Sequence, residues 1–219
     1  MTDNNLVIDV VSDVVCPWCF IGKRRLEQAL SLYHQQHPDA PTPLVRWNPF
    51  QLNPDLPAGG VSREAYLAQK FGDRAKGVYD RVSAVGKEVG IDFRFDLIAH
   101  QPNTLLAHSL VAQASDPATQ ALLVEALFVA YFLQGEDLSQ RETLSAIAQA
   151  CGLSADQIQS ALRHEDASAA IQAKDQSARE LGINGVPFYI FNASLGVSGA
   201  QEASTLVQAM HEALEESAS

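Results

Sequence analysis

Cysteine is scarce in this chain, with only 3 cysteines among 219 residues. So few thiols cannot form the dense disulfide framework of small secreted domains, and they are expected to serve catalysis, metal binding or core filling. Basic residues are also few. The chain has 15 lysines and arginines against 26 aspartates and glutamates, which gives a net charge of −11. This balance argues against a nucleic-acid partner, whose phosphates attract cationic proteins.

Long apolar runs and targeting signals are missing as well. No apolar run in the sequence approaches the roughly 20 residues that span a bilayer. Residues 1–9 contain neither a basic start nor an apolar stretch of signal-peptide length. We therefore expect a protein of the reducing cytoplasm with no membrane partner. Hydrophobic residues make up 47% of the chain, which is enough for a core without disulfide support.

The N-terminal part of the chain alternates between strand and helix patterns. Residues 6–11 are β-branched and apolar, which is typical of a short buried strand. An apolar stripe with helical spacing follows over residues 20–33, and the prolines at 38, 41 and 43 end that helix. Residues 44–47 predict a second strand, and the proline-rich residues 48–57 predict a loop.

From residue 62 to about 181 the pattern is almost wholly helical. Two capping boxes, Ser139 with Glu142 and Ser154 with Gln157, predict helix starts within this stretch.

Strand patterns return near the C-terminus, at residues 187–191 and 195–197. A third capping box, Ser198 with Gln201, predicts the start of a final helix. Strands at both ends of the chain around a helical insertion predict an α/β protein with one mixed sheet. The expected domains are residues 1–60 with 182–219, and the insertion 61–181.

The run Cys16-Pro17-Trp18-Cys19 lies between the first predicted strand and the first predicted helix. With Cys16 at the N-cap, Pro17 falls at the first helical position, where its missing N–H costs nothing. The Cys16 sulfur then faces free N–H groups and the positive end of the helix dipole, which stabilise a thiolate. Cys19 lies one turn along and points inward. Cys16 is therefore predicted to attack and Cys19 to resolve the mixed disulfide.

Two other interpretations of this C-x-x-C pair stay open. A zinc site would need about two further thiolate or imidazole ligands, for which Cys151, His34 and His37 are the candidates considered. Because no second cysteine pair exists, we predict no metal site. The remaining alternative is that the pair only fills the core.

Five segments together resemble the DsbA-like thiol–disulfide oxidoreductases of the FrnE branch: residues 12–19, 49–54, 102–104, 185–188 and 197–201. The resemblance spans essentially the whole chain and implies a thioredoxin fold interrupted by a helical domain. It also implies that Pro187, preceded by Val186, is a cis-proline facing the active site. Phe50 and Asn103 resemble groove-lining positions of the family, although loop packing and helix capping explain them equally well.

Two residues beside the cysteines complete the candidate site. Trp18 is predicted to tune the redox pair and line the substrate groove. Asp13 is either a buried base for Cys19 or a cap for the end of the strand, and we favour the cap.

The sequence thus predicts a cytoplasmic oxidoreductase that exchanges disulfides with proteins or glutathione and holds no bound cofactor. The alternative is a glutathione-dependent enzyme of the 2-hydroxychromene-2-carboxylate isomerase or kappa transferase type, which the resemblance also includes. Those enzymes typically carry serine at the nucleophile position, whereas this chain has Cys16. The resemblance allows a monomer or a homodimer.

Overall fold

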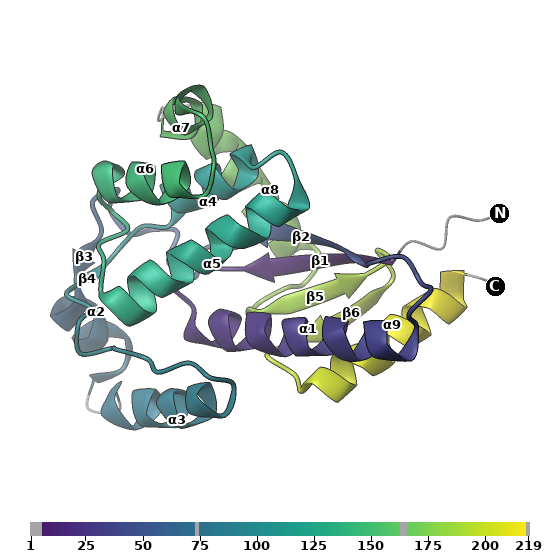
Figure 1. Cartoon of the computed structure of the whole chain (residues 1–219). Coiled ribbons are helices and arrows are strands. Elements are labelled where there is room, and N and C mark those ends of the chain that lie inside the picture. The colour runs from purple at the N-terminus through teal and green to yellow at the C-terminus, as the bar shows by residue number, and fades with distance from the viewer. Residues whose placement is uncertain (1–5, 73–74, 163–165, 218–219) are drawn as a thin grey trace.

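A computed structural model of the chain describes residues 6–72, 75–162 and 166–217 (Figure 1). It is an α/β structure in which a sheet carries helices on both faces, as the sequence predicts. The expectation of no targeting signal rests on residues 1–9, of which the first five lie outside the described part of the chain.

The main sheet has four strands in the order β2 (Leu44–Pro49), β1 (Val7–Ser12), β5 (Phe188–Phe191) and β6 (Leu195–Ser198). β1 and β2 are parallel because helix α1 (Pro17–Gln36) crosses between them, whereas β5 pairs antiparallel with β1 and β6 antiparallel with β5. All four strands lie where the apolar patterns predict them.

The two faces of the sheet pack against different sets of side chains. Ile8 and Val10 of β1 belong to the main hydrophobic core, whereas Val11 joins a smaller cluster with Phe50 and Ile183. This division follows the two-residue period of a strand. Helices α1 and α9 (Ala203–Ser217) lie together on one side of the sheet (Figure 1). The opposite face is covered only in part, because Val11 packs with Ala178 of the inserted segment there, whereas Asp9, Asn48 and Ile190 line a surface pocket of about 290 Å³.

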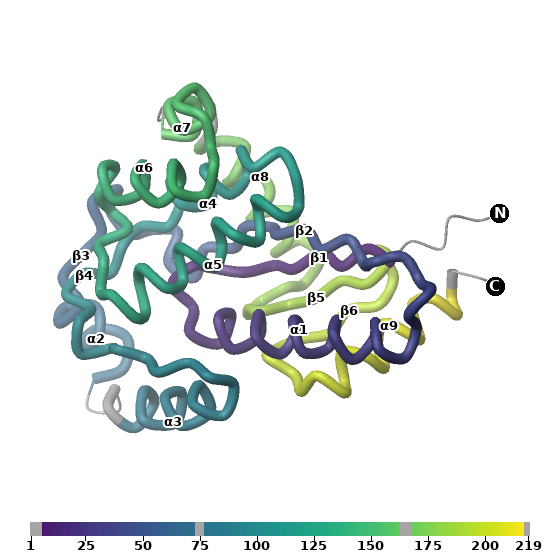
Figure 2. Tube along the Cα trace, in the orientation of Figure 1, coloured from purple at the N-terminus to yellow at the C-terminus, as the bar shows by residue number. Residues whose placement is uncertain are grey.

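Between β2 and β5 the chain leaves the sheet and forms a mostly helical segment (Figure 2). Its helices are α2 (Arg63–Lys70), α3 (Ala75–Glu88), α4 (Leu105–Gln113), α5 (Pro117–Gln134), α6 (Arg141–Ala150), α7 (Ala155–Leu162) and α8 (Asp166–Glu180). Two short strands, β3 (Val61–Ser62) and β4 (His100–Gln101), pair antiparallel, and residues 89–104 contain no helix. The expectation of an almost wholly helical insertion is wrong there. The main core runs through both parts, so the domain boundaries stay a prediction.

One of the three expected capping boxes is present. Gln157 accepts from the Ser154 N–H at 2.9 Å and donates its own N–H to the Ser154 hydroxyl at 3.3 Å. The box at Ser139 is wrong, because the Ser139 N–H donates to the carboxylate of Asp137 and α6 starts after Gln140.

The box at Ser198 is also wrong, because the last helix begins later than this motif predicts. Helix α9 starts at Ala203, and the Gln201 side chain donates to the Ser198 carbonyl oxygen at 2.8 Å.

Helix α5 is apolar enough to resemble a membrane-spanning helix, which the sequence analysis does not predict. Over its 18 residues the mean hydropathy is 1.2, so by length and composition alone it could cross a membrane. Its side chains Leu123, Leu127, Phe128 and Tyr131 are all buried in the main core. The apolar composition of α5 therefore has a structural use as a central core helix.

The start of α1 is held against the helical segment by stacked aromatic rings and ion pairs. The ring of Phe20 stacks on Phe128 with centroids 5.0 Å apart, and Phe93 meets it edge-on at 6.0 Å. Next to these rings, the Lys23 ammonium lies 2.8 Å from the Glu125 carboxylate of α5. The N-terminal turn of α1 is therefore fixed between the sheet and the inserted helices (Figure 1).

A substitution at Gly22 tests this close packing. A Cβ atom at Gly22 would lie within 3.0 Å of the Tyr189 hydroxyl and the Pro187 ring. We expect Gly22→Ala to lower the free energy of unfolding by about 1–3 kcal/mol, the usual cost of overpacking. The control is Gly77→Ala in α3, where no atom lies within 4 Å of the new Cβ. It should stabilise the helix by about 0.5–1 kcal/mol. Denaturant unfolding measures both, and Gly22→Ala as stable as wild type would contradict the packing.

Candidate functional site

The two cysteines lie at the N-terminal end of α1, where the sequence places them. Cys16 is the N-cap residue with an extended backbone (φ −94°, ψ 112°), and Pro17 opens the helix. Cys16 and Cys19 are both free thiols and are only 4% and 1% exposed. The strand–turn–helix geometry follows from the residues themselves, since proline is pre-organised for the first turn.

The contacts of the Cys16 sulfur differ from the expected ones. The Cys16 side chain accepts no capping hydrogen bond, and the Cys19 N–H donates to the Cys16 carbonyl oxygen at 3.0 Å. A protonated thiol is a donor, and this one points to the Val186 carbonyl oxygen at 3.5 Å. The helix end therefore acts on Cys16 through its dipole and not through direct hydrogen bonds.

Pro187 completes the site from the other end of the chain. The Val186–Pro187 peptide bond is cis, in agreement with the geometry that the resemblance implies. The contact between the Cys16 sulfur and the Val186 carbonyl joins residues that are 170 positions apart. Residues 16, 19, 186 and 187 are thus brought together at one place.

Cys19 is a buried thiol that holds its proton firmly. Burial raises the pKa of Cys19 well above its ordinary value, and the neighbouring Cys16 raises it further. The Ser12 hydroxyl and the Asp13 backbone N–H bond to the sulfur and act in the opposite direction. At neutral pH Cys19 is therefore a thiol and must lose a proton before it can attack a disulfide.

The Asp13 carboxylate is fully buried and serves the surrounding backbone. It accepts from the Leu52 N–H at 2.7 Å and lies 3.5 Å from the Val15 N–H. The Val15 contact is the local one that a cap of the strand end makes, whereas the shorter contact joins Asp13 to Leu52, 39 positions away. The carboxylate also lies 3.4 Å from Nε2 of His108, a residue of α4.

The remaining predicted residues make structural contacts. Trp18 is half-buried against the main core. Phe50 is 2% exposed, and the Arg179 guanidinium lies 4.2 Å from its ring centroid. Asn103 accepts from the Leu105 N–H at 3.0 Å at the start of α4. Asn103 also accepts from the Gln51 side-chain amide at 3.1 Å and donates to the Leu56 carbonyl oxygen at 2.7 Å. The groove-lining role of Phe50 and Asn103 stays a prediction.

Sequence reasoning misses Arg63, a buried cation in the inserted segment. Its guanidinium donates to the Tyr79 hydroxyl at 2.6 Å and to the Tyr131 hydroxyl at 3.3 Å. Within the described ranges no carboxylate lies within 4 Å of it. Burial raises the pKa of Tyr79. The positive charge of Arg63 lowers this pKa, and the charge of Cys16 raises it. Tyr79 therefore lies within electrostatic reach of both. The sequence does not reveal these buried contacts, because one arginine at the start of an amphipathic helix is usually exposed.

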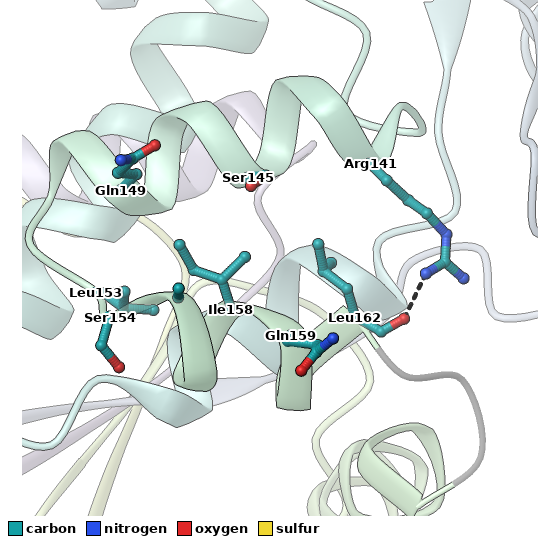
Figure 3. Close-up of a pocket in the computed structure, with 9 residues that line it drawn as sticks. Arg141, Ser145, Gln149, Leu153, Ser154, Ile158, Gln159 and Leu162 are labelled. Atoms are coloured by element: carbon teal, nitrogen blue, oxygen red, sulfur yellow. Dashed lines mark hydrogen bonds between the residues drawn. The ribbon is translucent and has the colours of Figure 1, made fainter.

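Two surface pockets are candidates for binding. One, of about 730 Å³, lies between α6 and α7 with Arg141 and Ile158 on its walls, and neither cysteine lines it (Figure 3). The other, of about 620 Å³, lies between loop 52–57 and α2 and is lined by Leu52, Tyr66 and other residues. Because Asp13 holds the backbone of Leu52, only this second pocket is tied directly to the turn that carries the cysteines.

The environments of the three cysteines predict selective alkylation. We expect limiting iodoacetamide at about pH 6 to label Cys16 of the reduced protein at least about tenfold faster than the other two. The pKa of Cys19 is raised by burial and by Cys16, and burial also raises the pKa of Cys151. Only Cys16 stands at a helix N-terminus. Peptide mass mapping measures the labelling, and equal rates at Cys16 and Cys151 would contradict the role of the helix end.

Comparison with known proteins agrees with this geometry. The family model of the DsbA-like thioredoxin domain matches residues 7–211. The chain belongs to the DsbA-like thioredoxin domain family. Among solved structures, the probable DsbA oxidoreductase SCO1869 from Streptomyces coelicolor is 28% identical with a TM-score of 0.84, covering 97% of this chain and 91% of that one. The thioredoxin fold with a helical insertion is therefore confirmed.

More distant members and neighbours of this DsbA-like family extend the comparison. The uncharacterized protein YwbO of Bacillus subtilis is 25% identical over 84% of this chain and 85% of its own length. A 2-hydroxychromene-2-carboxylate isomerase is 16% identical with a TM-score of 0.70, covering 97% of this chain and 98% of that one. That likeness shows a shared fold. The FrnE branch stays a prediction.

Proposed function

We propose that this protein is a dithiol–disulfide oxidoreductase that cycles between the Cys16–Cys19 dithiol and its disulfide. One observation carries the proposal: two free thiols stand at the start of α1, and the Cys16 sulfur faces the Val186 carbonyl, in a chain of the DsbA-like family. Cys16 forms the mixed disulfide because it stands at the positive end of the helix, and Cys19 resolves it from one turn deeper.

The proposed partners are protein disulfides or dithiols, or glutathione, and no bound cofactor is required. The pocket between loop 52–57 and α2 offers both apolar and polar groups, the Leu56 side chain and the Lys70 ammonium among them. A peptide or a tripeptide thiol suits such a surface. The proposed location in the cytoplasm rests on the small number of cysteines. Either a monomer or a homodimer is compatible with this chemistry.

Equilibration in defined glutathione buffers tests the proposal. We expect Cys16 and Cys19 to lose their thiols together as the buffer becomes more oxidising, with a disulfide that peptide mapping assigns to this pair. Cys151 is the internal control and should stay free, since it lies in a buried position away from the pair. The midpoint of this titration gives the reduction potential of the cysteine pair. The difference between this potential and that of the compartment sets the direction of electron flow, and about 30 mV corresponds to about 1.4 kcal/mol. A protein whose pair never forms a disulfide in any buffer would contradict the proposal.

A further inference from the structure

A small cavity lies between the sheet and the inserted helices. It is lined by the polar residues Ser12, Trp47, Asn48 and His108 and by the valines Val14, Val111 and Val124. The volume open to a water-sized sphere is about 10 Å³, close to the minimum that one water molecule needs.

Two residues that line this cavity each have a buried nitrogen without a hydrogen bond. The indole Nε1 of Trp47 and Nε2 of His108 make no hydrogen bond to any residue in the described part of the chain, although Nε2 lies 3.4 Å from the Asp13 carboxylate. A buried polar atom left in this way costs about 1–3 kcal/mol, and proteins usually satisfy such atoms with an ordered water. The cavity therefore suits one water molecule held by Trp47 and His108.

The cavity reaches the resolving cysteine through Ser12. Ser12 lines the cavity, and its hydroxyl hydrogen-bonds the Cys19 sulfur, which lowers the pKa of that thiol. Asp13 bonds the sulfur through its backbone N–H. Its carboxylate oxygens lie instead 2.7 Å from the Leu52 N–H and 3.4 Å from Nε2 of His108.

We propose that His108, on the inserted helix α4, takes up the proton of Cys19 through the Ser12 hydroxyl and a water in this cavity. Asp13, 3.4 Å from the imidazole, stabilises the imidazolium that forms. The inference rests on the proposed function. His108 acts through Ser12 and is a positioning and proton-relay residue, since it touches neither the substrate nor the sulfurs.

Resolution of the mixed disulfide moves one proton and one electron pair away from the Cys19 thiol. The Cys19 thiol gives its proton to the relay, and its electron pair forms the bond to the Cys16 sulfur. The bond between Cys16 and the substrate sulfur breaks, and the substrate leaves as a thiolate that takes a proton from the relay or from solvent.

The groups around the imidazole come from four elements. Asp13, after β1, is the charged group that the described structure places within 4 Å of it. Ser12 of β1 and both Trp47 and Asn48 of β2 are polar and neutral, while the other cavity residues from α4 and α5 are valines.

The test follows the two chemical steps separately. Reduced protein is mixed with oxidised glutathione, quenched with acid, and the Cys16 mixed disulfide is counted by mass spectrometry. In His108→Gln we expect mixed-disulfide formation at the wild-type rate and decay about 10²-fold slower at pH 7, in the range of general acid–base effects. The difference should shrink at higher pH, where hydroxide replaces the relay. His34→Gln, the same substitution at an exposed histidine, should decay like wild type.

Asp13→Asn is the second variant, because an asparagine can still accept from the Leu52 N–H. We expect its decay to slow about tenfold or more with the same pH dependence. Thermal unfolding checks both variants, and if His108→Gln does not fold, Asp13→Asn decides. The inference is overturned if the variants decay at the wild-type rate with the wild-type pH profile. It is also overturned if formation and decay of the mixed disulfide slow equally. If wild type forms no Cys16 mixed disulfide at all, the proposed function itself fails.

Discussion

Replacing Cys16 by serine is expected to abolish disulfide exchange, lowering the rate by roughly 10³-fold or more. The thiolate is the nucleophile in thiol–disulfide exchange, and a serine hydroxyl does not ionise at neutral pH and forms no stable bond to sulfur. The positive end of α1 and the Val186 carbonyl, which face the sulfur, cannot compensate for its loss. Insulin reduction and a glutathione-coupled assay measure the effect.

Cys151→Ser is the matched control for Cys16→Ser. It makes the same chemical change at a thiol that is 8% exposed at the end of α6 and outside the site. Its activity should equal that of wild type. Equal activity of Cys16→Ser and wild type in both assays would rule out Cys16 as the nucleophile and with it the proposed function.

The cysteine pair could be predicted from the sequence because its signals are local. Cys16, Pro17 and Cys19 are adjacent in the chain, and the N-cap preference of the turn and the helical position of proline do not depend on the rest of the fold. The strands of the main sheet were predictable for the same reason, since each shows a short apolar pattern of its own. Local patterns therefore fix the elements that carry the nucleophile.

The other half of the site depends on contacts between distant residues. His108 reaches Asp13 from α4, and Arg63 meets Tyr79 and Tyr131 from three different helices. A lone polar residue in an apolar helix has no periodicity that would reveal its partner. The capping box predicted at Ser139 is absent for a related reason. Asp137 lies closer in the turn and accepts from the Ser139 N–H, the donor that Glu142 would have used.

The inserted helical segment is thus part of the redox site as well as a cover for it. Its aromatic side chains Phe93 and Phe128 hold Phe20, the residue directly after Cys19. The same segment supplies His108, which lines the cavity beside Ser12. A change at Phe93, Phe128 or His108 is therefore expected to alter the surroundings of the cysteine pair.

Cys19→Ser separates disulfide exchange from the alternative glutathione-dependent isomerase or transferase activity. In a disulfide exchanger this variant still attacks through Cys16 but cannot resolve the product. We therefore expect it to accumulate one glutathionyl group per chain when reduced protein meets oxidised glutathione. Turnover in the insulin assay should fall by about 10²-fold or more. The Cys16→Ser variant is the control for this trapping and should gain no such group at residue 19, because the Cys19 thiol is 1% exposed and its pKa is raised by burial.

The two mechanisms differ because they use the second cysteine differently. An isomerase or transferase needs only the residue at the helix N-cap to meet glutathione, so Cys19→Ser would keep full activity and trap nothing. Disulfide exchange needs a second sulfur behind the first, and the fold supplies one that is buried, hydrogen-bonded to Ser12 and one turn from Cys16. Intact-mass analysis after a short exposure to oxidised glutathione distinguishes the outcomes. A Cys19→Ser protein that stays unmodified and reduces insulin like wild type would eliminate the resolving role of Cys19.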